Sequence, residues 1–134
     1  MSRNRFVVPE VKRIPLSEDE WIEVKSELNA GEQRRQIALA YTPVALPDGR
    51  VVDRRDLSQY ELMRVHLWLT AWHIHDAAGN VPPLSLDAIR ALDVETFEEI
   101  NDKIYEHIVS VEMLTAEKKR MREKSSSAEV MSMS

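Results

Sequence analysis

Residues 53–76 read DRRDLSQYELMRVHLWLTAWHIHD, and they predict one long helix that is apolar on more than one side. At about 100° per residue, the apolar side chains of this helix separate into two stripes. The first stripe contains Leu57, Tyr60, Met63, Leu67, Ala71 and Ile74. The second stripe contains Leu62, Val65 and Leu69 and is widened by Trp68 and Trp72. A helix with this pattern is either central in its own domain or covered by another molecule.

Two interpretations of the second stripe remain open. As core, the stripe requires helices on two sides, which the rest of the chain can supply. As an interface, it offers tryptophans, which commonly anchor contacts between proteins. The candidate partner-binding residues are then Met63, Val65, Trp68, Leu69 and Trp72. If this surface binds a partner, Trp72→Asp weakens binding and leaves the domain folded; unfolding of the variant identifies Trp72 as core.

The chain before this stretch predicts an extended opening followed by two helices. Residues 1–16 contain a Phe-Val-Val-Pro sequence, which favours an edge strand or extended structure. Ser17, with Glu20 three residues later, is typical of a capping box and predicts a helix over residues 18–30. A shorter helix is predicted over residues 32–41.

A β-hairpin is predicted over residues 42–52, which read TPVALPDGRVV. The Pro-Asp-Gly sequence forms its turn, because Gly49 adopts positive φ without steric cost. A lone hairpin is marginally stable in water, so this one needs a third strand, a helix beneath it or another subunit. Asp53 or Asp56 then caps the helix that follows.

Glycine and two prolines between residues 76 and 83 end the central helix. Ser85 caps a short helix that ends near Leu92, and Asp93 caps the last helix. The buried stripe of the last helix consists of Phe97, Ile100, Ile104, Ile108 and Val111. This stripe fades after Leu114, and the final residues, SSSAEVMSMS, have the composition of a disordered tail.

These patterns predict a mainly α fold. The helical domain spans residues 17–124 and contains about four to five helices with a short β-hairpin. An extended N-terminal segment precedes it over residues 1–16, and a disordered tail follows it over residues 125–134.

Composition and motifs exclude several classes of function. The formal net charge of −5 disfavours general binding of nucleic acid, which relies on neutralising phosphates. No run of about 18 apolar residues is present, so no membrane-spanning segment is expected. The sequence contains no cysteine and no glycine-rich phosphate loop. We therefore expect a protein of the cytosol with no cofactor.

Neither a metal site nor a catalytic group is expected. His66, His73 and His75 form the only cluster that resembles a metal site, but helical spacing keeps the first two about two turns apart. The carboxylates of the last helix lie opposite its apolar stripe and form a solvated face. These carboxylates are Glu98, Glu99, Asp102 and Glu106.

Several short motifs occur in an order typical of one protein family. Residues 28–35 read LNAGEQRR and combine a helix break with a Glu-Gln-Arg-Arg sequence. A tryptophan-bearing segment follows and ends in an Asp/Gly turn at residues 72–79. The remaining motifs are Leu84-Ser85-Leu86, residues 89–92, and a helix built on Phe97, Ile100, Ile104 and His107. Over residues 14–125, the chain resembles the tail assembly chaperones of long-tailed bacteriophages with siphovirus-like tails.

The resemblance implies a function without catalysis. Such proteins bind the tape measure protein, a very long helical protein, and keep it soluble while the tail tube forms around it. They act in the cytoplasm of the infected bacterial host and are not expected in the mature virion. The resemblance further implies a homo-oligomer or multiple copies on the client, and a longer form of the chain made by ribosomal frameshifting. The alternative is a structural head–tail connector or tail-completion protein of the virion.

Overall fold

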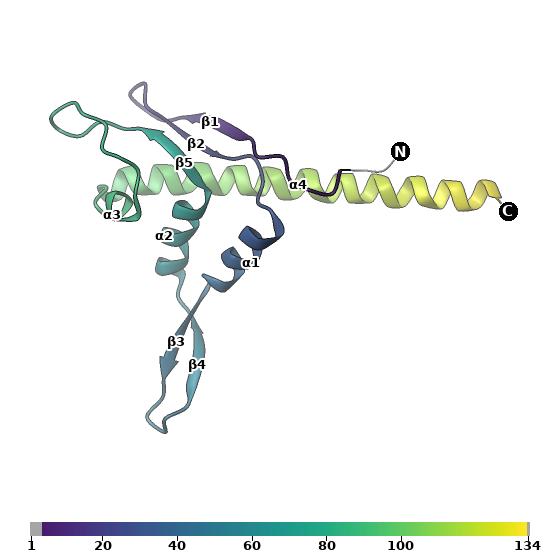
Figure 1. Cartoon of the computed structure of the whole chain (residues 1–134), viewed down its shortest axis with the longest axis horizontal. Helices are drawn as coiled ribbons and strands as arrows, with labels where there is room; N and C mark the ends of the chain where they lie inside the picture. The colour runs from purple at the N-terminus through teal and green to yellow at the C-terminus, as the bar shows by residue number, and fades with distance from the viewer. Residues whose placement is uncertain (1–3, 134) are drawn as a thin grey trace. The chain divides into compact units, whose positions relative to one another are not determined.

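The computed structural model describes the backbone of residues 4–133 and the side chains of residues 4–124. The chain divides into two compact units, of which the first ends at Ile104 and the second begins at Tyr105. The described residues form five strands and four helices (Figure 1). In chain order these are β1 (Val11–Pro15), β2 (Trp21–Lys25), α1 (Ala30–Ala38), β3 (Tyr41–Ala45), β4 (Val51–Arg55), α2 (Leu57–Trp68), β5 (Leu69–His73), α3 (Leu86–Arg90) and α4 (Val94–Met133).

The prediction of a mainly α fold is wrong. Over residues 4–124 the structure is 47% helical and 21% strand, and its strands form two antiparallel sheets. One sheet has the strand order β1-β2-β5, and the other is the two-stranded β3–β4 hairpin. The three-stranded sheet takes up two segments for which the sequence predicted helix, at residues 21–25 and 69–73.

β1 and β2 form a hairpin where the sequence predicted a helix over residues 18–30. Ser17 does not cap a helix: it begins a tight turn in which Glu18 and Asp19 have φ values of 58° and 61°. Two successive residues with positive φ are typical of a type I′ turn, whose twist matches that of paired strands. Alternation confirms the strand, because Ile22 and Val24 are fully buried while their neighbours are half-buried.

The long helix predicted over residues 53–76 is interrupted at Trp68. Asp56 is its N-cap and accepts a hydrogen bond from the Gln59 backbone N–H at 3.1 Å. The backbone becomes extended at Leu69, with φ −76° and ψ 124°, and continues as β5. β5 pairs with β2, and Trp72 lies opposite Ile22. The spacing of the apolar residues in this stretch fits both a helix and a strand. Pairing with the distant strand β2 decides in favour of a strand.

The core of the first unit lies between the inner face of the three-stranded sheet and α2, α3 and the first turns of α4. Its buried side chains come from each of these elements. They are Ile22, Val24, Val65, Leu67, Trp68, Leu69, Trp72, Ile74, Ile89, Ile100 and Ile104. Burying a large aliphatic or aromatic side chain contributes about 1.5–3 kcal/mol, so this set outweighs any surface contact.

Several local predictions are confirmed. Gly49 has φ +87°, and β3 pairs with β4 across the predicted turn, with Ala45 opposite Val51. Ser85 caps α3, and Asp93 accepts a hydrogen bond from the Thr96 N–H at 2.7 Å at the start of α4. β3 and β4 contact each other more than either contacts any other element.

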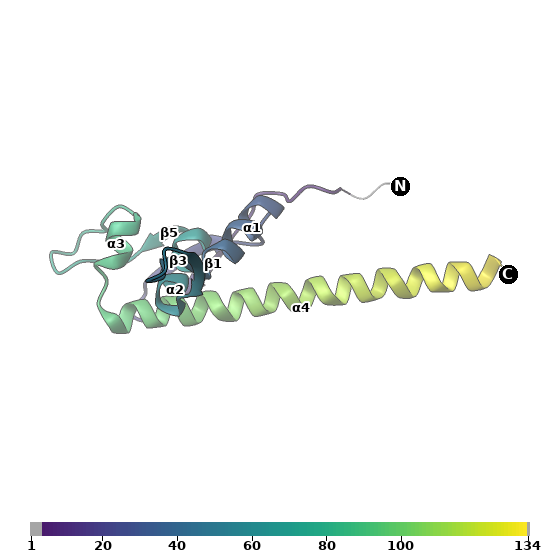
Figure 2. The same ribbon diagram turned by 90° about the horizontal axis from the view of Figure 1, so that it is seen from below.

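The capping box is present, but at a different place from the predicted one. Asn29 is the N-cap of α1, and its side chain and that of Glu32 each bond the other's backbone N–H. The helix predicted over residues 32–41 is α1, which lies at residues 30–38, whereas the helix predicted to end at residue 30 is absent. α4 continues as one helix to Met133 (Figure 2). The tail predicted over residues 125–134 lies outside the residues whose side chains are described, so its disorder stays a prediction.

Candidate functional site

The predicted partner-binding residues lie mostly in the core of the first unit. Val65, Trp68, Leu69 and Trp72 expose 0%, 3%, 6% and 7% of their surfaces. They do not form one helix face, because Trp68 ends α2 and Trp72 lies in β5. The structure therefore supports the core interpretation of the second stripe. Binding of a partner by these side chains stays a prediction that requires the unit to open.

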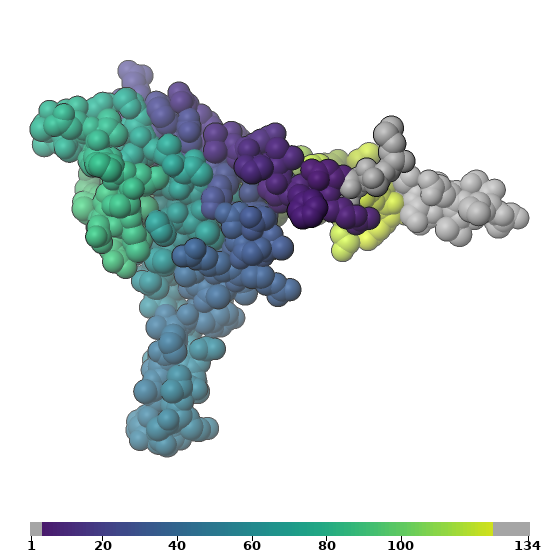
Figure 3. Space-filling model, viewed as in Figure 1, coloured from purple at the N-terminus to yellow at the C-terminus, as the bar shows by residue number. Residues whose placement is uncertain are grey.

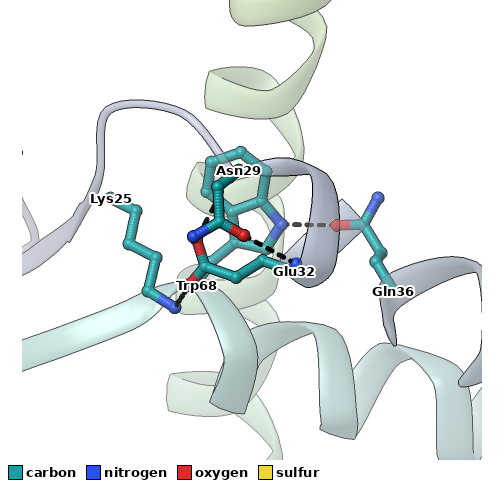
Figure 4. A network of polar contacts seen from close by, with 5 residues as sticks. All are labelled: Lys25, Asn29, Glu32, Gln36 and Trp68. Carbon is teal, nitrogen blue, oxygen red and sulfur yellow. Dashed lines mark hydrogen bonds and ion pairs between the residues drawn. The ribbon is translucent and has the colours of Figure 1, made fainter. Parts of the chain in front are cut away.

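Both core tryptophans also form hydrogen bonds through their indole nitrogens. The Trp68 Nε1–H donates to Gln36 Oε1 at 2.6 Å, which joins α2 to α1 (Figure 4). The Trp72 Nε1–H donates to the Pro82 carbonyl at 2.7 Å. Each ring thus buries its apolar body and satisfies its polar edge, as buried tryptophans usually do. These bonds are features of a packed core and fix α1 and the loop after β5 in place.

Met63 is the one predicted partner-binding residue that is half-buried. It lines a small cavity of about 220 Å³ between α1 and α2, together with Leu39, Leu67 and Leu69. Lys25, Arg35 and His66 line the same cavity. Lys25 forms an ion pair with Glu32, so the cations here are partly neutralised.

Glu32 joins β2 to the first turn of α1. Its carboxylate binds the Lys25 ammonium and accepts the Asn29 backbone N–H at 3.1 Å (Figure 4). The bond with Lys25 holds the pKa of the Glu32 carboxyl below its usual value, and the Asn29 N–H acts in the same direction. Hydrogen bonds and a nearby cation both favour the ionised form. This network holds the start of α1 against β2.

The histidines of the sequence analysis have different neighbours from those that a helix predicts. His73 stacks on Trp21 with ring centroids 5.4 Å apart, and His75 meets His73 edge-on at 4.6 Å. On the other side of Trp21, the Arg13 guanidinium lies 3.7 Å from the ring centroid. These side chains form a layered stack on the outer face of the sheet. No group of His, Cys, Asp or Glu in the described part of the chain is arranged to hold a metal ion.

Exposed apolar side chains gather on the second unit. Met113, Leu114 and Met121 expose 68%, 55% and 63% of their surfaces. On a helix these three positions fall within about 100° of one another. We call them the α4 apolar face. Over its described residues the second unit is a single helix, so it has no other element of its own to cover them.

Sequence reasoning missed the α4 apolar face. It followed the stripe of Phe97, Ile100 and Ile104 and ended it after Leu114. The missed residues lie at a different angle on the same helix, between the charged side chains Glu106, Glu117 and Arg120. Plotting residues 105–124 separately from the preceding turns separates the two faces.

Comparison with protein-family models, curated proteins and solved structures finds no match for this chain. Among the residues that the structure describes, no helix combines the length and the apolar character needed to cross a membrane.

Proposed function

We propose that this chain is a phage tail assembly chaperone, which binds the tape measure protein and keeps it soluble while the tail tube assembles. The protein acts without catalysis, in the cytoplasm of the infected bacterial host, and does not remain in the virion. The observation that carries the proposal is the α4 apolar face, on a helix whose own unit does not bury it. The motif order at residues 28–35 and 72–107 supports it independently.

The chemistry of this face suits a helical client. Amphipathic helices bind one another through apolar side chains spaced along one face. Methionine is flexible and polarisable, so Met113 and Met121 adapt to different apolar neighbours along a long client. The flanking residues Glu106, Glu117 and Arg120 carry both signs of charge and keep the free helix hydrated.

Several copies on one client strengthen the binding. A single short apolar face buries little area and binds weakly. A long helical client repeats similar apolar stripes, so neighbouring copies that also touch one another gain avidity without new contacts. The proposal therefore includes multiple copies of the chain on each client.

Co-expression with the tape measure protein tests this proposal. A tagged chain is expected to co-purify with the client and to raise the soluble fraction of that client. Replacing both Leu114 and Met121 with Asp is expected to weaken binding by at least about a hundredfold, because each loss of apolar burial costs about 1.5–3 kcal/mol. The matched control is Lys119→Asp, which changes more charge per site on the opposite side of the same helix.

The two variants separate specific docking from a general effect of charge. Equal loss of binding in Lys119→Asp and in the Leu114/Met121 variant contradicts docking through the α4 apolar face. If the wild-type chain and the tape measure protein do not co-purify at all, the chaperone proposal fails.

A head–tail connector or tail-completion subunit is the second candidate. The β3–β4 hairpin favours it, because its strands contact chiefly each other and such a hairpin is marginally stable alone. Val51 in β4 is 67% exposed, as expected for an arm that is covered by a neighbouring subunit. Detection of the chain in purified virions supports this candidate and contradicts the chaperone, which is absent from finished particles.

A further inference from the structure

The residues before β1 form an arm that displays an aromatic side chain to solvent. Phe6 exposes 86% of its surface, and Val8 exposes 56%. The Asn4 side chain bonds both polar groups of the Phe6 backbone: Nδ2 donates to the carbonyl at 2.9 Å, and Oδ1 accepts from the N–H at 3.2 Å. These bonds bend the chain at Phe6 and limit the entropy that its binding would cost.

A cleft with complementary chemistry lies in the same unit. It has a volume of about 380 Å³ and is formed by the end of β5, the loop after it, α3 and the start of α4. We call it the loop cleft. A cavity of about 150 Å³ is sufficient for a benzene molecule, so the loop cleft accommodates a phenylalanine ring. Its lining includes the apolar residues Trp72, Ile74, Pro82 and Leu92 and the acidic residues Asp76 and Asp93.

The two carboxylates of the loop cleft are fixed by local hydrogen bonds. Asp76 Oδ1 accepts the backbone N–H groups of Ala78 and Asn80, each at 3.0 Å. Asp93 Oδ1 accepts the Thr96 N–H at 2.7 Å, and this bond lowers the pKa of the Asp93 carboxyl. Neither carboxylate forms an ion pair with a side chain in the described part of the protein. Both negative charges therefore remain available to pair with a cation.

The arm carries the matching groups in adjacent positions. Arg5 precedes Phe6, so a cation and an aromatic ring are neighbours in the chain. A planar guanidinium binds carboxylates well, and a ring fills an apolar space lined by Trp72 and Pro82. The charge and the apolar character of the arm thus complement those of the loop cleft.

The arm of the same chain is too short to fill the cleft. Strand register places Val11 at one end of the sheet and His73 at the other, two strands away. At about 3.3 Å per residue and 4.8 Å per strand, these positions are about 16 Å apart. The five residues from Phe6 to Val11 span at most about 17 Å. The arm is thus almost fully extended when it reaches His73, and all of the cleft lining except Trp72 follows His73 in the chain.

The direction of the arm agrees with this estimate. Within the first unit, the arm leaves β1 on the side away from the loop that follows β5 (Figure 1). On the surface shown, the dark purple arm and the teal loop residues lie at opposite ends of the first unit (Figure 3). We propose that the N-terminal arm of one copy binds the loop cleft of a second copy, with Phe6 in the apolar interior and Arg5 beside the two carboxylates.

Cross-linking between two single-cysteine variants tests the contact, because the natural chain contains no cysteine. Val8→Cys labels the arm and leaves Phe6 intact, and Ala91→Cys labels the wall of the cleft. The two variants, one of them tagged, are mixed in equal amounts and treated with a short bis-maleimide. A cross-linked dimer that contains one tagged and one untagged chain is expected.

Two controls make the result decisive. Val8→Cys mixed with Val51→Cys, a label on the exposed β3–β4 hairpin, is expected to give at least fivefold less of the mixed dimer. Adding Phe6→Ala to the Val8→Cys chain is expected to lower the yield with Ala91→Cys at least as much. Because Phe6 is exposed in a single copy, this substitution leaves the circular dichroism spectrum unchanged.

Either of two results overturns the proposal. One is a mixed dimer that forms no better with the cleft label than with the hairpin label, or that persists in full after Phe6→Ala. The other is a Val8→Cys/Ala91→Cys double variant that cross-links only within one chain. Neither result bears on the α4 apolar face, so this proposal and the proposed function fail separately.

Discussion

Trp72 shows how a single residue joins the sheet to the loop that follows it. Its ring lies opposite Ile22 in the buried face of the sheet, and its Nε1–H donates to the Pro82 carbonyl at 2.7 Å. Only 7% of the side chain is exposed. Because the ring is core, its polar edge and its apolar body contribute separately to stability.

Two substitutions at this position separate those contributions. Trp72→Phe keeps an aromatic ring but leaves the Pro82 carbonyl without its donor, so we expect a loss of about 1–3 kcal/mol in the free energy of unfolding. Trp72→Asp buries an unpaired charge, and we expect it to unfold the first unit. Urea denaturation followed by tryptophan fluorescence measures both, with Val51→Asp on the exposed hairpin as the control. A stable, folded Trp72→Asp variant would contradict the core assignment and restore Trp72 as a binding residue.

Asp19 has a backbone conformation that lowers the stability of the folded chain. Its φ of 61° is left-handed, a conformation that costs a non-glycine residue about 1–2 kcal/mol. Glycine removes this cost but gains entropy in the unfolded chain, so Asp19→Gly is expected to raise the stability by several tenths to about 1 kcal/mol. Asp19→Ala, which keeps the Cβ, should give no such gain. Thermal unfolding of the three proteins decides the matter, and a destabilised glycine variant would mean that the Asp19 carboxylate contributes more than the turn strain costs.

Elements that depend on local interactions could be predicted from the sequence, whereas elements that depend on distant pairing could not. The β3–β4 hairpin and the caps of α2, α3 and α4 could be predicted, because Gly49, Asp56, Ser85 and Asp93 act on their immediate neighbours. β5 could not, because its partner β2 lies more than forty residues earlier and its apolar spacing also fits a helix. Neglect of distant pairing also explains the wrong prediction at Ser17. Its capping pattern predicted a helix, whereas the next two residues have positive φ and form a turn.

The candidate site was predictable only in part, for a related reason. Trp68 and Trp72 are large and apolar, and both features suit a core as well as an interface. Pairing of β5 with β2 removes them from the surface, and no property of residues 53–76 alone reports that pairing. The α4 apolar face is visible in the sequence as Met113, Leu114 and Met121. Recognising these residues as a separate face requires the knowledge that the first and second parts of α4 belong to different units.

The contact between β2 and α1 predicts a pH dependence. Because the pKa of the Glu32 carboxyl is lowered in the folded chain, its ionised form stabilises the fold at pH values above its unfolded pKa of 4.5. That contribution is lost as the pH falls from this value through the lower, folded pKa. Glu32→Gln should therefore be less stable than the natural protein at pH 7 and should lose this difference once the pH falls below the folded pKa of Glu32.

Urea denaturation at a series of pH values measures this difference. Glu27→Gln is the control, since Glu27 is exposed and forms no ion pair among the described side chains. A constant difference between the natural protein and Glu32→Gln across this range would show that the carboxylate acts through packing and not through its charge.

For the whole molecule, the division into two units implies unequal local stability. The first unit closes a core of strands and helices, whereas the second consists of one helix over its described residues. Helices without tertiary packing are marginal in water, because nucleation is costly and packing supplies most of their stability. Residues 113–124 should therefore exchange their amide hydrogens at least a hundredfold faster than β2 and β5 in the free protein.

Hydrogen exchange measured by mass spectrometry, with and without the tape measure protein, connects this property to the proposed function. A client that covers Met113, Leu114 and Met121 should slow exchange over residues 113–124 and leave β2 and β5 unchanged. If these residues are already protected in the free protein, a dilution series shows whether a second copy covers them. Protection that persists at every dilution would contradict an open α4 apolar face, because the only surface left to cover it would then belong to the same chain.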